Sequence, residues 1–364
     1  MRNKKINICS LLIALSLSTP TIAFADNESV QSRILNGEQA NKVANDLLPW
    51  QAAMLMMPDA NEQASAGCGA VVISDFWLVT AAHCAQTGIG MSTTVVAGTT
   101  LIPNTTGDAH SVDSRYKFNV VRKIIHPHYN GTKDLDHDIA LLKVDRKLTS
   151  VAKPIKIATV KEQATADNAF ANTWNESAYS KANLITSGWG LTESTTQANE
   201  LMVVKLAGIP DKSCDTGGYP LTSNSHFVCA DSNNPDIKKD ACRGDSGGPL
   251  IWQNPERASD RDYGLRVVGV TSSGPYCENK ENGDSNAQFN GLYTELATYY
   301  SWVEQVTGID FDSAAPADYS VDPFEKVRED NPSDKVNIPS SGGGSLPLSA
   351  LAGLTLFGLL RRNK

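Results

Sequence analysis

Between Ile34 and about Gly308 the chain alternates short apolar runs with Gly, Asn, Asp and Pro. The runs are rich in β-branched residues: "GAVVISDFWLVT" (69–80), "STTVVAG" (92–98), "DIALLKV" (138–144), "NLITSGWG" (183–190), "LRVVGVTSSG" (265–274) and "GLYTEL" (291–296). Their length and spacing are typical of an all-β barrel or sandwich. No ten-residue helical period separates them, which disfavours a parallel α/β sheet. One helix is expected, over 294–308, where apolar residues recur at helical spacing and Gly308 is a stop signal.

The N-terminus differs from this pattern. Arg2, Lys4 and Lys5 precede an apolar run that ends in Ala23-Phe24-Ala25, and this resembles a signal-peptidase site. We predict a signal peptide at residues 1–25 and export of the remainder through an inner membrane. A transmembrane anchor is the alternative, but the apolar run is short for it.

The C-terminus changes composition after Gly308. Residues 309–340 are acidic and rich in Pro and Ser, which predicts a solvated linker. Residues 341–364 hold a glycine patch, a short hydrophobic segment and a basic end. The segment from Leu346 to Leu360 is roughly 22 Å long as a helix, marginal against about 30 Å of hydrocarbon. This order resembles a bacterial Gly-Gly C-terminal sorting signal, which implies sorting machinery, transient membrane contact and delivery to the cell surface or medium. A plain tail anchor is the alternative.

Composition narrows the class of protein. Of 364 residues, 41% are hydrophobic and 20% charged, enough to bury a core. The net charge of −8 argues against nucleic acid as a partner. Removal of Cys9 with the signal leaves an even number of cysteines, which predicts disulfides in an exported protein without choosing the pairing. No Cys-x-x-Cys pair is present, which disfavours zinc. These cysteines are Cys68, Cys84, Cys214, Cys229, Cys242 and Cys277.

The stretch "DACRGDSGGPL" (240–250) places Ser246 between glycines. Read as G-x-S-x-G, it would be the nucleophile elbow of a lipase-like hydrolase, which requires a histidine after the serine. All histidines precede Ser246, so that interpretation fails: His83, His110, His126, His128, His137 and His226. The order His, Asp, Ser remains open, with His83 in "LVTAAHC" and Asp138 in "DLDHDIALLKV".

With these three motifs in order, the chain resembles the trypsin-like (chymotrypsin-fold) serine endopeptidases from Ile34 to about Gly308. The resemblance includes "PWQ" (49–51), "SGWG" (187–190) and "YYSWV" (299–303). It implies two six-stranded antiparallel Greek-key barrels, an active site in the cleft between them and a C-terminal helix. Ser246 would attack, His83 would take and return its proton, and Asp138 would orient the imidazole.

The resemblance assigns further residues. The N–H groups of Gly244 and Ser246 would form the oxyanion hole, and Gly244 would adopt a conformation that a Cβ opposes. Asp136 is a rival for the acid role, although Asp138 lies directly before the strand. His126-Pro-His128 is interpreted as a polar turn rather than a metal pair, and His137 as a surface loop residue. The implied disulfides are Cys68–Cys84, Cys214–Cys229 and Cys242–Cys277.

Substrate specificity follows from the same resemblance. Asp240 would lie at the base of the primary pocket and select Arg or Lys, while Gly274 and Gly291 would keep the walls open. Ser272 belongs to the same wall. Ser273 stands where the family commonly has Trp, which leaves the other subsites open. The family's calcium ligands are missing, and we predict no metal and no cofactor.

Activation is implied by "SR|ILNG" (32–37), which resembles the family's activation junction. Cleavage after Arg33 would remove residues 26–33 as a propeptide and free the amino group of Ile34 to pair with Asp245. Asn36 occupies a position where glycine is usual. Cleavage by the enzyme itself is a hypothesis, because Arg33 suits the expected pocket.

The sequence therefore predicts a secreted, monomeric serine endopeptidase of a Gram-negative bacterium, with a peptidase domain at 34–308. Its partners would be protein or peptide substrates with Arg or Lys before the scissile bond. Two alternatives remain: a catalytically silent homologue that acts as an adhesin or binding module, and an enzyme whose main role is esterase activity.

Overall fold

The structure is a computed structural model, and all the residues it describes fall within the unit Gln31–Lys364. The described ranges are 34–44, 46–56, 65–87, 93–102, 112–131, 135–191, 198–216, 226–274 and 290–329. The predicted signal peptide, Arg33, His110, Cys277 and the sorting segment lie outside them. Within these ranges, no helix is long and apolar enough to cross a membrane.

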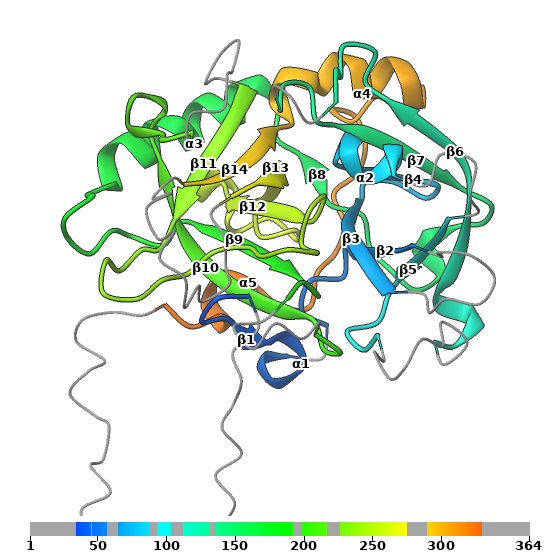
Figure 1. Ribbon diagram of the computed structural model, residues 1–364, viewed down its shortest axis with the longest axis horizontal. Coiled ribbons are helices and arrows are strands. Elements are labelled where there is room, and N and C mark those ends of the chain that lie inside the picture. The colour runs from blue at the N-terminus through cyan, green and yellow to red at the C-terminus, as the bar shows by residue number, and fades with distance from the viewer. Residues whose placement is uncertain are drawn as a thin grey trace, which may run out of the picture. The chain divides into compact units, whose positions relative to one another are not determined.

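The first half of the domain is a closed antiparallel barrel, drawn in blue to teal in Figure 1. Its strands, in the order β2-β3-β4-β7-β6-β5, are β2 (Gln51–Met56), β3 (Ser65–Val72), β4 (Trp77–Thr80), β7 (Ala140–Val144), β6 (Lys117–Ile125) and β5 (Thr94–Ala97). Alternate residues such as Ala52, Met54 and Leu142 fill the barrel interior. The residues between them, such as Ala53 and Leu141, join the larger core outside it. Most of these strands are therefore buried on both faces and read as continuous apolar runs, whereas β6 is largely exposed on one side and carries Arg122 and Lys123.

The second half is another ring of antiparallel strands, green to yellow in Figure 1 apart from the orange β14. Pairing runs β10-β11-β14-β13-β12-β9 and returns to β10. The strands are β9 (Leu184–Gly188), β10 (Met202–Ile209), β11 (Phe227–Asp231), β12 (Pro249–Gln253), β13 (Leu265–Ser273) and β14 (Gly291–Glu295). Two short strands extend this sheet: β1 (Glu38–Gln39) pairs with β10, and β8 (Lys156–Ile157) pairs with β13. The prediction of two six-stranded antiparallel barrels is confirmed.

The C-terminal helix is confirmed and is shorter than its apolar pattern suggested. Helix α4 (Tyr300–Thr307) follows a 3₁₀ turn at Ala297–Tyr299, because the preceding residues complete β14. Gly308 ends it in the left-handed conformation, with φ of 71°. The remaining short helices are α1 (Ala40–Val43), α2 (Ala82–Gln86) and α5 (Pro323–Lys326).

Helix α3 (Val160–Thr173) is a 14-residue element, so the expectation of a single convincing helix is wrong. It buries only a narrow face, chiefly Ala166 and Phe170, so hydrophobic periodicity gives a weak signal. The local signal is a capping box, in which Thr159 and Glu162 satisfy each other's backbone N–H groups.

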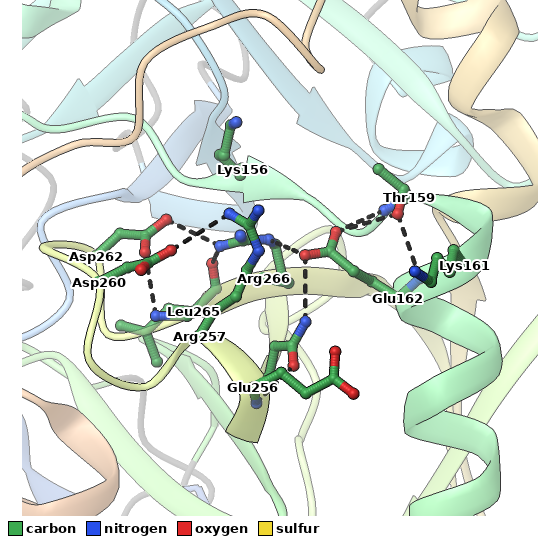
Figure 2. A network of polar contacts seen from close by, with 12 residues as sticks. Lys156, Thr159, Lys161, Glu162, Glu256, Arg257, Asp260, Asp262, Leu265 and Arg266 are labelled. Atoms are coloured by element: carbon green, nitrogen blue, oxygen red, sulfur yellow. Dashed lines mark hydrogen bonds and ion pairs between the residues drawn. The ribbon is translucent and has the colours of Figure 1, made fainter.

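Glu162 also ties α3 to the second barrel, as Figure 2 shows. Its Oε1 accepts a hydrogen bond from Arg266 Nε on β13 at 2.8 Å, and Asp262 Oδ2 accepts one from Arg266 Nη1 at 2.8 Å. Arg266 is only 2% exposed, and a guanidinium this buried is tolerated because two carboxylates pair with it. Burial raises the pKa of Glu162, but the charge of Arg266 and the cap bonds outweigh it and leave that pKa below its ordinary value.

After α4 the chain returns across the domain as a strap, residues 309–329, drawn in orange in Figure 1. The Tyr319 ring packs edge-on against Trp50, with centroids 4.9 Å apart, and its hydroxyl donates to Pro154 O at 2.7 Å. Phe311 and Val327 are also buried. Over these residues the structure differs from the predicted solvated linker, since the few large apolar residues all pack against the domain.

The second half of the strap lies on the other barrel. Gln253 Nε2 donates to Asp322 Oδ2 at 2.8 Å, and Lys205 Nζ donates to Phe324 O at 2.6 Å. Glu329 Oε1 accepts hydrogen bonds from Tyr179 Oη and from Ala182 N. The acidic composition of this segment therefore supplies acceptors to specific donors of the domain, in addition to contacts with water.

Candidate active site

His83 and Asp138 form a hydrogen-bonded pair. His83 lies on α2, directly after β4, and Asp138 lies two residues before β7, the strand that pairs with β4. His83 Nδ1 is 2.8 Å from Asp138 Oδ2, and the backbone N–H of His83 donates to Asp138 Oδ1 at 2.9 Å. Asp138 is fully buried, and Ser272 Oγ also donates to its Oδ2, at 2.7 Å.

The acid determines the proton affinity of the imidazole. Burial lowers the pKa of His83, but the hydrogen bond that His83 donates to Asp138 and the negative charge of Asp138 outweigh burial, and the pKa lies above its ordinary value. A base in this state accepts a proton readily near neutral pH. Asp136, the rival acid, is near His226 instead, with Oδ1 3.4 Å from His226 Nδ1.

Ser246 lies in the turn before β12, beside α2. Its carbonyl oxygen accepts a hydrogen bond from Gly69 N at 2.7 Å. The Sγ atom of Cys84 lies 3.5 Å from that carbonyl oxygen and 3.5 Å from His83 Nε2. Ser246 and His83 therefore both lie next to the Cys84 sulfur atom. The structure brings together the serine, histidine and aspartate, which are far apart in the sequence.

Two glycines shape the turn around Ser246. Gly244 has φ of 98°, as the sequence predicted for a position that a Cβ would oppose. Gly247 has φ of 79°, and a Cβ there would lie 2.1 Å from Thr80 Oγ1. Any side chain at residue 247 would force the turn away from β4, and with it the serine away from α2.

Asp240 lies buried beside the two predicted wall glycines. A Cβ on Gly291 would be 2.6 Å from Asp240 Oδ1, and one on Gly274 would be 3.5 Å from its Oδ2. Burial and then the charge of Asp231 raise the pKa of Asp240 well above its ordinary value. The Asp240 carboxyl group, which is costly to ionise, therefore lies next to two residues without side chains, Gly274 and Gly291.

The start of the peptidase domain reaches the same region. Ile34 is fully buried, and Leu35 N donates to Asp240 O at 3.2 Å. Asn36 has φ of 55°, the left-handed conformation that explains why glycine is usual there.

Asp245 is fully buried, and it accepts hydrogen bonds from Cys242 N and Gly190 N, both at 2.8 Å. Burial raises its pKa to about 6 although both bonds oppose the shift.

The cysteine pairing agrees with the resemblance where the structure describes it. Cys68 is bonded to Cys84 and Cys214 to Cys229. The first bond ties α2, which carries His83, to β3. Cys242 takes part in a disulfide, while its expected partner, Cys277, lies outside the described residues.

Four other histidines of the described residues lie close to one another near Asp138. His126 and His128 follow the end of β6, as expected of a polar turn, but His126 is buried against the Tyr299 and Trp302 rings. His137, expected on the surface, is half-buried, and its Nδ1 is 3.1 Å from the Tyr299 hydroxyl. Burial, followed by the charges of His137 and His128, lowers the pKa of His126 to about 4.

Sequence reasoning missed several contacts of the site. It assigned Ser272 to the pocket wall and did not foresee the hydrogen bond to Asp138. It also missed Thr294, whose hydroxyl donates to Asp138 O at 3.0 Å, and Gly188, where a Cβ would lie 2.0 Å from Asp245 Oδ1. None of these residues has a local signal, because each role depends on a partner more than 50 positions away.

Two antiparallel barrels with a buried Asp–His pair beside a serine in a glycine turn define the class of chymotrypsin-fold serine proteases. The family described as Trypsin matches residues 34–303, and the chain belongs to that family.

Individual relatives are distant. The chain is 26% identical to human kallikrein-14 over 303 residues, which cover 81% of this chain and 91% of that protein. It is 29% identical to mouse ovochymase-2 over 286 residues, covering 76% of this chain, and 27% identical to ovochymase of Halocynthia roretzi over 316 residues, covering 85%. These matches span only 41% and 17% of the two ovochymases.

Proposed function

We propose that this protein is an endopeptidase that cleaves after Arg or Lys through an acyl-enzyme intermediate. The observation that carries the specificity is the buried Asp240 carboxylate between Gly274 and Gly291. An ionised carboxylate in this surrounding is costly, and a guanidinium or ammonium from the substrate compensates for it. A neutral side chain would leave the charge unpaired, so the same residue excludes apolar substrates.

In this proposal the triad performs the chemistry. His83 accepts the proton of the Ser246 hydroxyl as the oxygen attacks the carbonyl carbon, and it returns the proton to the leaving amine. Asp138 holds the imidazole tautomer and stabilises the imidazolium. The backbone N–H groups of Gly244 and Ser246 bind the oxyanion, each contributing about 3–4 kcal/mol in comparable enzymes. Water then hydrolyses the acyl-enzyme with His83 as the base.

We also propose that cleavage after Arg33 activates the protein. The new α-amino group of Ile34 would pair with Asp245. That carboxylate is fully buried and accepts two backbone hydrogen bonds. A cation beside it compensates for the burial that raises its pKa. The pairing would order the turn that holds Gly244 and the pocket that holds Asp240.

The ends of the chain support a place outside the cytoplasm. Residues 1–25 would direct export, and residues 341–364 would engage sorting machinery at the membrane. The product would act on protein or peptide substrates at the cell surface or in the medium. The disulfides Cys68–Cys84 and Cys214–Cys229 support this location, because such bonds persist in oxidising compartments.

A substrate panel tests the specificity. Protein cleaved after Arg33 is assayed with amide substrates that end in Arg, Lys, Phe or Ala, with and without a serine-directed covalent inhibitor. We expect inhibitor-sensitive turnover of the Arg and Lys substrates only. Asp240→Ser should lower kcat/KM for Arg by about 10²–10⁴-fold, since removing one partner of a buried ion pair costs about 3–5 kcal/mol.

The controls separate the alternatives. Ser246→Ala must abolish both inhibitor labelling and turnover, because Ser246 is the residue that reacts with both. Any residual turnover in that variant would come from a contaminant. Preference for Phe over Arg would exclude the role given to Asp240. Absence of any inhibitor-sensitive turnover, with the fold intact, would favour a silent homologue that acts as a binding module. Turnover of esters without amides would favour an esterase.

A further inference from the structure

Three imidazole rings from two segments meet beside the triad acid. His126 and His128 follow β6, and His137 precedes β7. Their ring centroids are 5.0 to 5.4 Å apart. One ring nitrogen from each residue lies within 4.8 Å of the other two. Convergent imidazole nitrogens are a donor set that borderline transition-metal ions prefer.

We propose that His126, His128 and His137 form a binding site for a divalent transition-metal ion, with Zn²⁺ as the best fit. Occupancy of this site slows catalysis through the peptide bond that joins His137 to Asp138. The effect on catalysis rests on the peptidase function proposed above, whereas the binding site does not.

The spacing of the rings is close to that of a three-histidine zinc site. Zn–N bonds of about 2.0–2.1 Å in a tetrahedron place ligand nitrogens roughly 3.4 Å apart. The three ring nitrogens now lie within 4.8 Å of one another and must approach to that shorter distance, which side-chain rotation can achieve. His126 is 9% exposed and held between the rings of Tyr299 and Trp302, so it is the fixed ligand. His128 is exposed and can turn toward it, with water in the fourth position.

Neighbouring groups orient and complement the ligands. The Tyr299 hydroxyl lies 3.1 Å from His137 Nδ1, and a metal-bound histidine usually directs its second ring nitrogen to an oxygen in this way. The His226 ring is 5.5 Å from His137, and the buried carboxylate of Asp136 lies 3.4 Å from His226 Nδ1. This carboxylate lies beside His226, one ring away from the cluster, and its negative charge favours a cation over an empty cluster.

The coupling to catalysis passes through a short stretch of backbone. His137 has φ of 58°, a left-handed conformation that is unfavourable for a residue with a side chain and persists because its surroundings hold it. Ile139 N donates to His137 O at 2.7 Å, so the backbone of residues 137–139 moves as one turn. Asp138, inside this turn, holds both Nδ1 and the backbone N–H of His83. Drawing the His137 ring toward a metal therefore changes the position of the triad acid.

Metal binding is measured first on a protein that cannot cleave. The full chain with Ser246→Ala is freed of metal by a chelator and titrated with Zn²⁺ in competition with a chromophoric chelator. We expect one equivalent to bind with Kd at or below about 10 μM, and Co²⁺ in its place to give a tetrahedral visible spectrum. Because His128 is exposed, His128→Ala should fold normally and weaken binding at least 100-fold, by rough analogy with lost zinc-site residues. Asn130→Ala, two residues further along the chain and also exposed, is the matched control and should bind as before.

Catalysis is measured second, on the protein with Ser246 intact. Zn²⁺ should lower kcat about fivefold or more in the parent and in the Asn130→Ala variant. It should lower kcat much less in the His128→Ala variant. Failure to bind one equivalent would overturn the site. Equal binding by His128→Ala would also overturn it and would indicate another ligand, such as His83. Binding that leaves kcat unchanged would overturn the coupling alone. A protein without peptidase activity would fail the proposed function, while the Ser246→Ala titration would still decide the metal site.

Discussion

The strap, residues 309–329, should stabilise the peptidase domain, and Tyr319 should be its main anchor. Its side chain is 5% exposed, its ring packs edge-on against Trp50 at 4.9 Å, and its hydroxyl donates to Pro154 O at 2.7 Å. Replacing a buried aromatic residue by Ala costs about 3–5 kcal/mol, a range that includes the lost ring–ring contact. The hydroxyl accounts for about 1 kcal/mol of this when measured by Tyr319→Phe.

The assay is urea and thermal unfolding in a Ser246→Ala background, so that no proteolysis intervenes. Tyr319→Ala should lower the free energy of unfolding by about 3–5 kcal/mol and Tm by roughly 6–12 °C. Tyr319→Phe should lower the free energy by about 1 kcal/mol. Ser320→Ala is the matched control: its neighbouring hydroxyl makes one exposed hydrogen bond, to Asp46, and its loss should cost no more than about 0.5 kcal/mol.

One result would refute this reasoning. If Tyr319→Ala changes the free energy of unfolding by less than about 1 kcal/mol, the strap separates from the barrels before the domain unfolds. Its contacts would then report a local equilibrium with its own small free energy. Hydrogen exchange of the strap amides in the parent protein would show that equilibrium directly, as exchange much faster than in the barrel strands.

Three further predictions concern the site and the network in Figure 2. The acid limb of the kcat/KM profile should have its midpoint above pH 6.5, because Asp138 raises the pKa of His83 and the base is lost as pH falls through that value; a midpoint below 6.5 would contradict the pairing. Ser272→Ala removes one of the three hydrogen bonds to the Asp138 carboxylate, so kcat/KM should fall less than about tenfold and unfolding free energy by about 1.5 kcal/mol; loss of all activity would assign Ser272 a larger role. Glu162→Gln should cost about 1–3 kcal/mol at pH 7, as it weakens the pairing of Arg266. Since the pKa of Glu162 is lowered in the folded state, this difference should be full above about pH 4.5 and vanish as pH falls through the lowered pKa; a difference that persists in acid would show that packing, and not charge, is responsible.

Local sequence patterns were sufficient to predict much of the fold. The apolar runs that became β5, β7, β9, β13 and β14 were predicted from the sequence, because strands buried on both faces read as continuous β-branched stretches. Helix α3 escaped that reasoning, since its buried face is narrow and its clearest signal is a cap at Thr159. The few apolar residues of the strap, such as Tyr319, do not recur at a helical or strand spacing, so their packing could not be predicted from the sequence.

The sequence alone predicted the catalytic roles of Ser246, His83 and Asp138, because the order of the motifs excluded the lipase arrangement and left one resemblance. Tertiary structure decided which groups surround them: Ser272 on the triad acid, Gly188 against Asp245, and three histidine rings in contact. These relations depend on which strands pair, and strand pairing joins residues that are distant in the chain and have no common local pattern. The sequence by itself therefore predicted the chemistry proposed for the site, and only the packed barrels decided which side chains surround it.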